Sequence, residues 1–431
     1  MAKSIYNIII SIIIIEITPK KIIEIPFKVS YSELKKDILN YMSTMYNSTI
    51  ITEIEIGTPL NKFNASIYLQ SYYSIILSNQ TNHLSKLFNQ KLSSTYKSIE
   101  TINTFINEPM DEFEFGEDII KIGNINLNKL KFALAKRLNY NYDYIISSTG
   151  IIGLRLKETF ENQDFPNYTL LHQLKENKLI DNNIFRFDFT SQEKGKLIIG
   201  ETIKENENYI KIPVGKFPQI EIDQTWGFNF DNIKYGNYSI NKYTNALLEV
   251  NIEFIVGTNN FIDIIKKEFF NKNKDKCSEK QTLVKGTGPI LYFECEKNID
   301  LSKVNNLVFE IKNINFSFIL KPKDLFIDFE DKKFFVITYS IDTNFKWIFG
   351  RYFLQKYSLY FDKDKKIVGV FQKSKFSFKS ILLLLISIFL IILIGGLMLI
   401  LFRLLKKRRR KRACELDDEF DYMTKEMLNN K

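Results

Sequence analysis

The sequence predicts a mostly β protein with two lobes, followed by a single transmembrane helix. Several stretches alternate polar and apolar residues as half-buried strands do, and the clearest are residues 52–56 and 226–236. The chain has 431 residues, of which 45% are hydrophobic, so it can bury a large core divided between two lobes. Residues 381–402 form an uncharged apolar run that spans a hydrocarbon core at about 1.5 Å per residue.

The net charge limits the partners that we expect, and the cysteines bear on the redox compartment. The net charge is +10, and +4 of it comes from the last 29 residues, which contain ten Lys and Arg against six Asp and Glu. No basic face with interleaved aromatic residues stands out, so we expect no nucleic-acid partner. Cys277 and Cys295 lie in the same half of the chain, and one cysteine pair in a secreted region usually forms a disulfide. Two free thiols are the alternative.

The N-terminal residues contain a candidate secretory signal. Residues 8–15 form an apolar run after Lys3 that is too short to span a bilayer, and it fits the hydrophobic part of a signal sequence. We therefore assign residues 1–20 to a signal peptide, with an uncleaved anchor as the alternative. Residues 23–29 then alternate like a strand, and Ser32 is a candidate N-cap for a helix that follows.

A predicted hairpin comes next, and the rest of the chain is organised around it. Residues 50–56 form its first strand, and Gly57-Thr58-Pro59 makes the turn. The second strand, at residues 63–67, leads into the four residues Tyr68-Leu69-Gln70-Ser71. This stretch resembles the opening of the pepsin-like aspartic protease family (peptidase A1), which has a strand, an I-G-T-P turn, a second strand and then D-T-G-S.

The resemblance extends along most of the chain. Segments that are similar to family motifs are residues 88–96, 118–123, 170–189, 195–200, 212–214, 226–236 and 346–371, the last being the most specific. It implies a bilobal double β-barrel, with an N-terminal lobe at 50–215 and a C-terminal lobe at 216–375. Residues 21–49 resemble the family's prosegment. Cys277 and Cys295 fall where the family's C-terminal lobe carries its most persistent disulfide.

The resemblance also locates the catalytic loops, and both are altered. Tyr68 and Glu249 stand where the family has its two catalytic Asp residues. Leu69 and Val250 replace the Thr residues whose hydroxyls cross the lobe interface in the family. The tight loops need Gly in the family, but here they hold Gln70 and Asn251, of which Asn tolerates positive φ.

Two further family features depart from the pattern in the same lobe. The flap expected at residues 104–116 lacks the family's Tyr and Gly, and Phe105 or Ile106 falls near the Tyr position. Residues 142–146 align with the family's F-D-G-I-L-G segment, so Ser147 replaces the Gly that closes the first loop.

These changes predict a site without peptidase activity. Aspartic proteolysis needs two carboxylates that share a proton, and the phenol of Tyr68, with a pKa near 10, is a poor base. Losing one member of a catalytic unit commonly costs on the order of 10⁴–10⁶ in rate. We therefore expect no catalytic residue, and we expect a catalytically inactive protein that binds a protein or peptide in the cleft between the lobes or on the domain surface. The alternatives are a divergent endopeptidase that uses Glu249, and an escorter whose tail carries a sorting signal.

No other chemistry is indicated by motifs. The sequence contains no H-E-x-x-H, C-x-x-C, G-x-S-x-G or P-loop pattern, so we expect neither a cofactor nor a metal. His83 and His172 both lie in polar contexts, where surface residues explain them better than a catalytic triad does.

The C-terminal region predicts a single-pass type I membrane protein of the secretory pathway or cell surface. The transmembrane helix at 381–402 is followed by the basic block 406–412, which the positive-inside rule places in the cytosol. The lumenal or extracellular side then carries the two lobes, and residues 403–431 form a cytoplasmic tail. The basic block acts either as a stop-transfer flank alone or as a contact for anionic lipid.

The sequence offers several sites for covalent modification. Cys414, in the tail, could be palmitoylated or remain a thiol. Six N-x-S/T sequons are candidate glycosylation sites, at Asn47, Asn64, Asn79, Asn167, Asn237 and Asn315.

Overall fold

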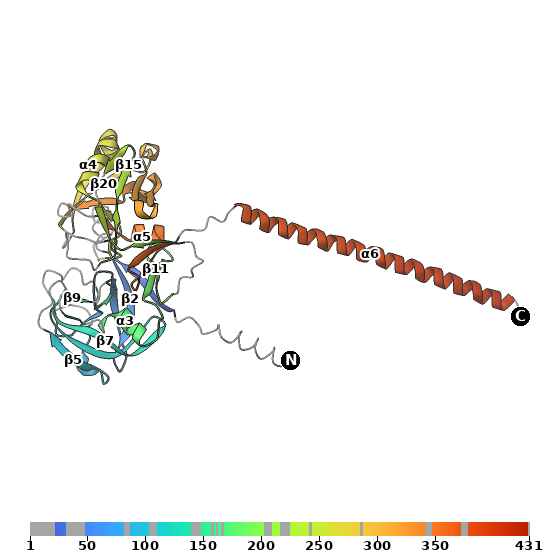
Figure 1. Ribbon diagram of the computed structural model, residues 1–431, viewed down its shortest axis with the longest axis horizontal. Coiled ribbons are helices and arrows are strands. Elements are labelled where there is room, and N and C mark those ends of the chain that lie inside the picture. Colours follow the sequence, from blue (N-terminus) through green and yellow to red (C-terminus); the bar gives the residue numbers. More distant parts are fainter. Residues whose placement is uncertain are drawn as a thin grey trace. The chain divides into compact units, whose positions relative to one another are not determined.

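The computed structural model describes residues 22–31, 48–81, 87–102, 110–138, 148–156, 159–160, 163–164, 168–201, 209–215, 225–240, 244–284, 288–340, 347–371 and 378–429. The chain divides into two compact units, residues 1–371 and residues 372–431. The first unit is mostly β, as the sequence predicts. Figure 1 shows its two lobes, one containing α4, β15 and β20 and the other containing β5, β7 and α3.

The largest sheet has thirteen strands. It contains the strands of the first lobe together with strands from near both ends of the first unit. The additional pairing of β2 with β6 closes six of its strands into a barrel, in the order β2-β3-β8-β4-β7-β6. In sheet order the thirteen strands are β13 (Tyr209–Pro213), β28 (Ile367–Phe371), β27 (Leu359–Asp362), β11 (Ile184–Phe189), β12 (Lys194–Ile199), β1 (Ile23–Ser30), β2 (Thr49–Ile56), β3 (Asn61–Tyr68), β8 (Gly150–Gly153), β4 (Ile75–Leu77), β7 (Ile125–Leu138), β6 (Met110–Ile122) and β5 (Lys97–Ile102).

The second lobe contains a nine-stranded sheet and a four-stranded sheet. The nine strands are β14 (Gly227–Phe230), β17 (Thr244–Leu248), β26 (Trp347–Phe349), β18 (Ile255–Val256), β25 (Ile337–Ser340), β20 (Gly288–Glu296), β24 (Lys332–Phe335) and β23 (Phe326–Phe329), with β19 (Cys277–Val284) paired to β20. The four strands are β16 (Tyr238–Ile240), β15 (Asn232–Tyr235), β21 (Leu307–Ile311) and β22 (Phe316–Leu320). A short pair, β9 (Thr159–Phe160) and β10 (Gln163–Asp164), completes the described strands.

Helices are few in the described part of the first unit and cover the sheets at isolated points. Within the described residues, the α-helices are α3 (Leu170–Glu176), α4 (Asn259–Glu268), α5 (Arg351–Tyr357) and α6 (Phe378–Asn429), and the short 3-10 turns are Gln90–Leu92, Phe270–Asn273, Leu301–Lys303, Lys312–Ile314 and Pro322–Asp324. The two Trp residues of the chain, Trp226 and Trp347, are almost completely buried, so each lies inside the packed core.

The strand predicted in the prosegment-like region is a central strand of the large sheet. β1 lies between β12 and β2, with Ile25 opposite Leu197 and Val29 opposite Ile50. The alternation of its sequence matches its environment, because Ile23, Ile25, Phe27 and Val29 are all buried. A family prosegment is removable, whereas β1 is bonded on both edges. The helix predicted after Ser32 lies outside the described residues.

The predicted disulfide is confirmed. Cys277 and Cys295 are bonded and lie directly opposite each other in the β19–β20 hairpin. Closing a loop of 18 residues stabilises the folded chain by roughly 3 kcal/mol in the chain-entropy view.

The second unit is one long helix. Within α6, Ile386–Arg410 is long and apolar enough to cross a membrane, with a mean hydropathy of 2.8 over its most apolar 18 residues. This overlaps the predicted span at 381–402. The helix continues without a break to Asn429, which the sequence analysis did not foresee. The type I orientation stays a prediction, and the predicted signal peptide lies outside the described residues.

The sequons differ in what the structure says of them. Asn64, Asn79, Asn237 and Asn315 are exposed, while Asn47 and Asn167 lie outside the described residues. Exposure is necessary for glycosylation, so the four described positions stay predictions, and Asn237 and Asn315 lie in or beside hairpin turns.

Candidate functional site

The two altered loops begin at equivalent places in the two lobes. β3 runs parallel to β8 and ends at Tyr68, which lies opposite Gly153. β17 runs parallel to β26 and ends at Leu248, so that Glu249 is the first residue after the strand. Each loop therefore leaves the end of a strand that is paired in parallel with a later strand of its own lobe.

Two side-chain amides join the loops across the lobe interface. The Gln70 Nε2 group donates a hydrogen bond to the carbonyl of Leu248 at 3.2 Å, and the Asn251 Nδ2 group donates to the carbonyl of Ile67 at 2.8 Å. The arrangement is symmetric. In each loop, the amide two residues after Tyr68 or Glu249 reaches the residue just before the other of these two positions. We call this pair of bonds the amide clasp.

The clasp was not predicted from the sequence. Leu69 and Val250 are completely buried, as expected of residues that only pack. The interlobe bonds are instead made one residue further on, at Gln70 and Asn251, which the sequence analysis treated only as replacements of glycine. Neither has a positive φ, so the glycine-like freedom of the family's loops is not used at these positions. The available signal was the presence of a side-chain amide at the same position of both loops.

Asn251 does more than bridge the lobes. Its Oδ1 accepts a hydrogen bond from the backbone N–H of Ile50 at 2.9 Å, so one buried side chain satisfies a donor and an acceptor on two strands. Both partners lie in the interior, where an unpaired backbone group is costly. Asn251 therefore fixes the second loop both to the start of β2, through Ile50, and to the end of β3, through Ile67.

The strand that closes the first loop is not the one that the alignment indicated. The structure places β8, Gly150–Gly153, against β3, so the family's G-I-L-G pattern corresponds to Gly150-Ile151-Ile152-Gly153. The assignment to residues 142–146 and Ser147 is therefore wrong; those residues lie outside the described part. A Cβ at Gly153 would lie 2.6 Å from the carbonyl oxygen of Ser71, which explains why a glycine is needed there.

Tyr68 belongs to the packing of the first lobe. Its side chain is half-buried and packs against a cluster of buried residues, Tyr72, Tyr73, Ile75, Leu77, Phe113, Phe115, Ala133, Ala135 and Ile151. The next loop residues are also held, because the Arg155 guanidinium donates to the Gln70 carbonyl at 3.3 Å and lies 3.9 Å from the centre of the Tyr72 ring. The position that the resemblance assigns to the first catalytic residue thus holds an aromatic ring that packs with its neighbours.

Glu249 keeps a carboxyl group at the second position. Desolvation by the surrounding protein raises the pKa of Glu249 to about 7, although part of the residue remains exposed. The backbone N–H groups of Asn251 and Val250 and the charge of Arg351 oppose this shift. Within the described residues, no second carboxylate contributes to the raised pKa. In a proton-sharing dyad, repulsion from the partner carboxylate would be a main cause.

A buried ion pair lies beneath the second loop. Arg351 is completely buried, donates to the carbonyl of Val250 at 2.9 Å and to Ser48 Oγ at 2.5 Å, and forms an ion pair with Glu253. Burial, followed by the nearby Glu253 carboxylate, raises the pKa of Tyr31 to about 12. The sequence analysis did not single out Arg351 or Glu253. The signal was available, because Gly350-Arg351 stands where the family has G-D.

The described part of the expected flap, residues 110–116, lies in β6. β5 pairs with β6, with Glu100 opposite Phe115, and a hydrogen bond from the Tyr96 hydroxyl to Glu114 supports the hairpin base. Lys136 also pairs with Glu114, at 2.8 Å. Residues 103–109, which include Phe105 and Ile106, lie outside the described part.

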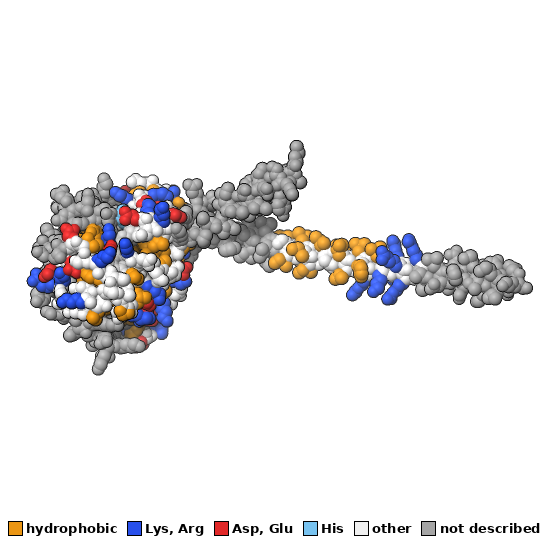
Figure 2. All heavy atoms as spheres, turned by 90° about the horizontal axis from the view of Figure 1, so that it is seen from below, with side chains coloured by type: hydrophobic (Ala, Val, Ile, Leu, Met, Phe, Trp, Pro, Cys, Tyr) orange, Lys and Arg blue, Asp and Glu red, His pale blue; other side chains and the backbone are white. Residues whose placement is uncertain are grey.

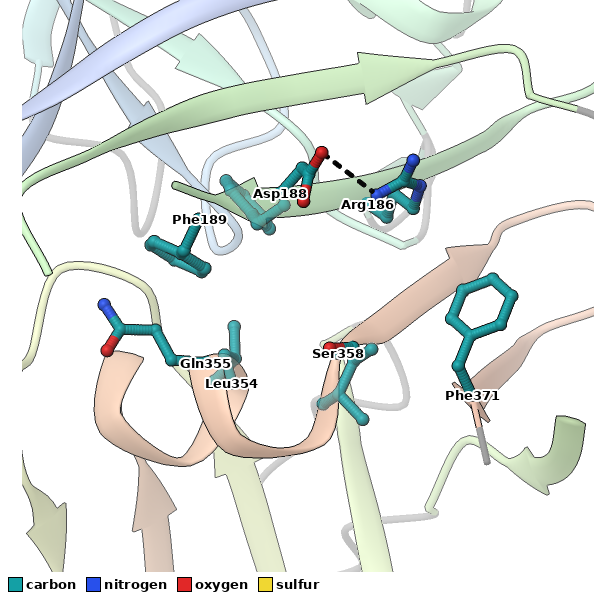
Figure 3. A pocket seen from close by; sticks show the side chains of 9 residues that line it. Arg186, Asp188, Phe189, Leu354, Gln355, Ser358 and Phe371 are labelled. Atoms are coloured by element: carbon teal, nitrogen blue, oxygen red, sulfur yellow. Dashed lines mark ion pairs between the residues drawn. The ribbon is translucent and has the colours of Figure 1, made fainter. Parts of the chain in front are cut away.

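A small pocket lies between β11 and α5 (Figure 3). Its polar wall consists of Arg186 and Asp188, which are 3.6 Å apart, together with Gln355 and Ser358 on the other side. Arg186 also pairs with Glu201 at 2.5 Å, so its charge is already compensated. None of the residues of the two loops line this pocket. Among the described residues, no group of His, Cys, Asp or Glu could hold a metal ion.

The hydrogen bonds of Asn251 and Gln70 should contribute unequally to the free energy of unfolding. Replacing Asn251 by Ala is expected to lower the free energy of unfolding by about 2–4 kcal/mol, because it leaves the Ile50 N–H and the Ile67 carbonyl buried without their partner. Gln70→Ala, which removes a single bond at a half-buried position, is the matched control and should cost about 1 kcal/mol. Urea unfolding followed by Trp fluorescence measures both. Equal losses would contradict the central role of Asn251.

Comparison with known proteins agrees with this geometry. Residues 49–373 match the model of the family described as eukaryotic aspartyl protease, which covers most of the chain. Among curated proteins, no significant match was found.

Proposed function

We propose that this chain, which belongs to the eukaryotic aspartyl protease family, is a membrane-anchored family member that binds a protein or peptide and does not cleave it. The observation that carries the proposal is that Tyr68 and Glu249 stand where the family has its two catalytic Asp residues, in loops that are otherwise held in place. The amide clasp supports a preserved loop arrangement, while the carboxylate pair that would activate a water is replaced.

The surroundings of the two positions support the same conclusion. The raised pKa of Glu249 arises from burial, and the groups that oppose it are backbone N–H groups and Arg351. A lone carboxyl with a pKa near 7 can donate or accept a proton, but peptide hydrolysis on this fold also needs a base for the attacking water. Tyr68, packed against the aromatic cluster, is a poor candidate for that base.

The interactions that hold the two loops favour a binding function over a complete loss of function. A domain without any function would not need two symmetric interlobe hydrogen bonds and a buried Arg351–Glu253 pair to hold its loops. The partner is expected between the lobes or on the domain surface, and an anchor such as α6 would keep the complex at a membrane.

The test is a cleavage assay on the full chain purified in detergent. The protein is incubated between pH 4 and 7 with a diverse peptide library, with and without a transition-state inhibitor of aspartic proteases, and products are identified by mass spectrometry. Cleavage is expected to stay at the level of the isosteric variant Glu249→Gln, while an active pepsin-like enzyme in the same assay serves as the positive control.

The opposite result has a specific meaning. Inhibitor-sensitive cleavage that disappears in Glu249→Gln would refute the proposal and make Glu249 half of a catalytic pair. The intact library is also screened for bound peptides, because saturable binding without cleavage is the outcome that the proposal requires.

A further inference from the structure

A band of seven consecutive basic residues follows the apolar part of α6. The band, residues 406–412, has the sequence KKRRRKR, and Lys406, Lys407, Arg408, Arg409, Arg410 and Arg412 are exposed. Figure 2 shows these basic side chains directly after the apolar stretch of the helix. The position of the band along the helix is therefore fixed by the same element that crosses the membrane.

The continuity of the helix determines how the band is presented. α6 runs unbroken from Phe378 to Asn429, so the band is helical throughout. At about 100° and 1.5 Å per residue, seven successive side chains point to all sides of the helix within roughly 9 Å along its axis. That height is similar to the thickness of the polar headgroup layer beside the hydrocarbon core. A band of this shape presents its charges on every side of the helix axis.

The charges of the band are not compensated along the helix. Residues 403–414 contain no Asp or Glu, and the first acidic residue is Glu415. On a helix, ion pairs form between residues three or four positions apart. Only Lys411 and Arg412 are that close to Glu415, so the five residues from Lys406 to Arg410 have no acidic residue within four positions on either side. Their counter-charges must come from outside the helix.

We propose that the band binds the headgroups of anionic phospholipids in the leaflet that it occupies. Guanidinium groups form bidentate hydrogen bonds with phosphate oxygens, and four of the seven residues are Arg. Basic segments beside a membrane span attract anionic lipids, and each added basic residue strengthens the attraction. The stop-transfer role left open by the sequence is a matter of insertion, and it is compatible with this binding. The proposal does not depend on whether the β domain cleaves peptides.

The test uses the full chain reconstituted in phosphatidylcholine vesicles that contain a minor fraction of spin-labelled phosphatidylserine in both leaflets. Equal composition of the leaflets removes any influence of orientation. Electron paramagnetic resonance then measures how strongly the labelled lipid is enriched next to the protein, relative to labelled phosphatidylcholine. We expect an enrichment of about threefold or more, which falls close to one at molar salt because exposed charges are screened.

Two variants identify the residues responsible. Replacing all seven band residues by Gln should abolish the enrichment, whereas Lys373→Gln, Lys375→Gln and Lys379→Gln together, on the other flank of the apolar stretch, should leave most of it. If the band variant fails to reconstitute, Arg408→Gln, Arg409→Gln and Arg410→Gln together should still lower the enrichment more than the three lysine substitutions do. Equal amounts of the two lipids next to the unmodified protein would overturn the proposal, and so would displacement of phosphatidylserine by equimolar inorganic phosphate.

Discussion

Replacing Arg351 by methionine is expected to lower the free energy of unfolding by about 3–5 kcal/mol. The guanidinium is completely buried and holds three groups at once, the Val250 carbonyl, the Ser48 hydroxyl and the Glu253 carboxylate. Met fills a similar volume but leaves the carboxylate of Glu253 buried without its cation. An uncompensated buried charge is among the most destabilising defects in a folded protein.

A double-mutant cycle separates the charge from the packing. Arg351→Met combined with Glu253→Leu should recover much of the loss, because a buried ion pair can often be replaced by apolar side chains at little net cost. Urea unfolding followed by the fluorescence of the buried residues Trp226 and Trp347 is the measurement. A double variant as unstable as Arg351→Met alone would show that the hydrogen bonds to Val250 and Ser48, and not the ion pair, dominate.

A second ion pair on the same helix provides the control. Lys356 pairs with Asp324 at 2.8 Å, but the Lys356 side chain is 28% exposed. Lys356→Met should therefore cost less, about 1 kcal/mol, because water still reaches both partners of this pair. If Arg351→Met were no more harmful than Lys356→Met, Arg351 would not be a structural centre of the second loop.

The sequence predicted the fold because the fold depends on local patterns that occur many times. Alternating strands, the motif at residues 346–371, the disulfide and the apolar C-terminal run each carry their own signal. These predictions are confirmed by the family match over residues 49–373, by Cys277–Cys295 and by α6. The extension of α6 past the apolar stretch was missed, because a charged segment has no apolar periodicity from which to recognise a helix.

The alignment error at β8 shows why local patterns are insufficient for a loop. The sequence contains an Ile-Ile pair at 145–146 and another at 151–152, and both fit a short buried strand. The structure selects the second pair, because Gly153 packs against the backbone of the first loop, with no room for a Cβ beside the Ser71 carbonyl. That close approach involves residues about 80 positions apart, so periodicity cannot reveal it.

The candidate site was predicted by position but not by its interactions. Tyr68 and Glu249 follow recognisable strands, and the structure places both at strand ends. Their assignment to the two catalytic positions of the family stays a prediction. The amide clasp was missed, because Gln70 and Leu248 are 178 residues apart and Asn251 and Ile67 are 184 residues apart. Long-range hydrogen bonds of this kind leave only a weak trace, the paired amides, in a single sequence.

β1 is expected to be as important for folding as any strand of the core, although it lies in the region that resembles a removable prosegment. Phe27 packs edge-on against Phe187 and Phe189 of β11, and a Cβ at Gly195 of β12 would lie 2.5 Å from the Phe27 ring. The neighbouring strand thus carries a glycine where this ring needs space. Thr52 also donates from its hydroxyl to the Pro26 carbonyl at 2.7 Å.

The start of β1 is held by a third element. Asn124, in the β6–β7 turn, accepts a hydrogen bond from the Glu24 N–H at 3.1 Å and donates to the Ile22 carbonyl at 3.4 Å. At the neighbouring Gly123, a Cβ would lie 2.1 Å from the Glu24 carbonyl oxygen, so this turn can approach the strand only as glycine. β2, β12 and the β6–β7 turn all enclose β1, so its removal would expose the edges of both neighbouring strands.

Phe27→Ala should therefore lower the free energy of unfolding by about 3–5 kcal/mol, the usual cost of removing a buried aromatic ring. Lys28→Ala, at an exposed position of the same strand, should change it by no more than about 0.5 kcal/mol. N-terminal sequencing of the protein recovered from membranes should find Ile23–Ser30 still present. A mature chain that begins after Ser48 and unfolds at the same urea concentration would contradict this, because β1 would then be dispensable, as a true prosegment is.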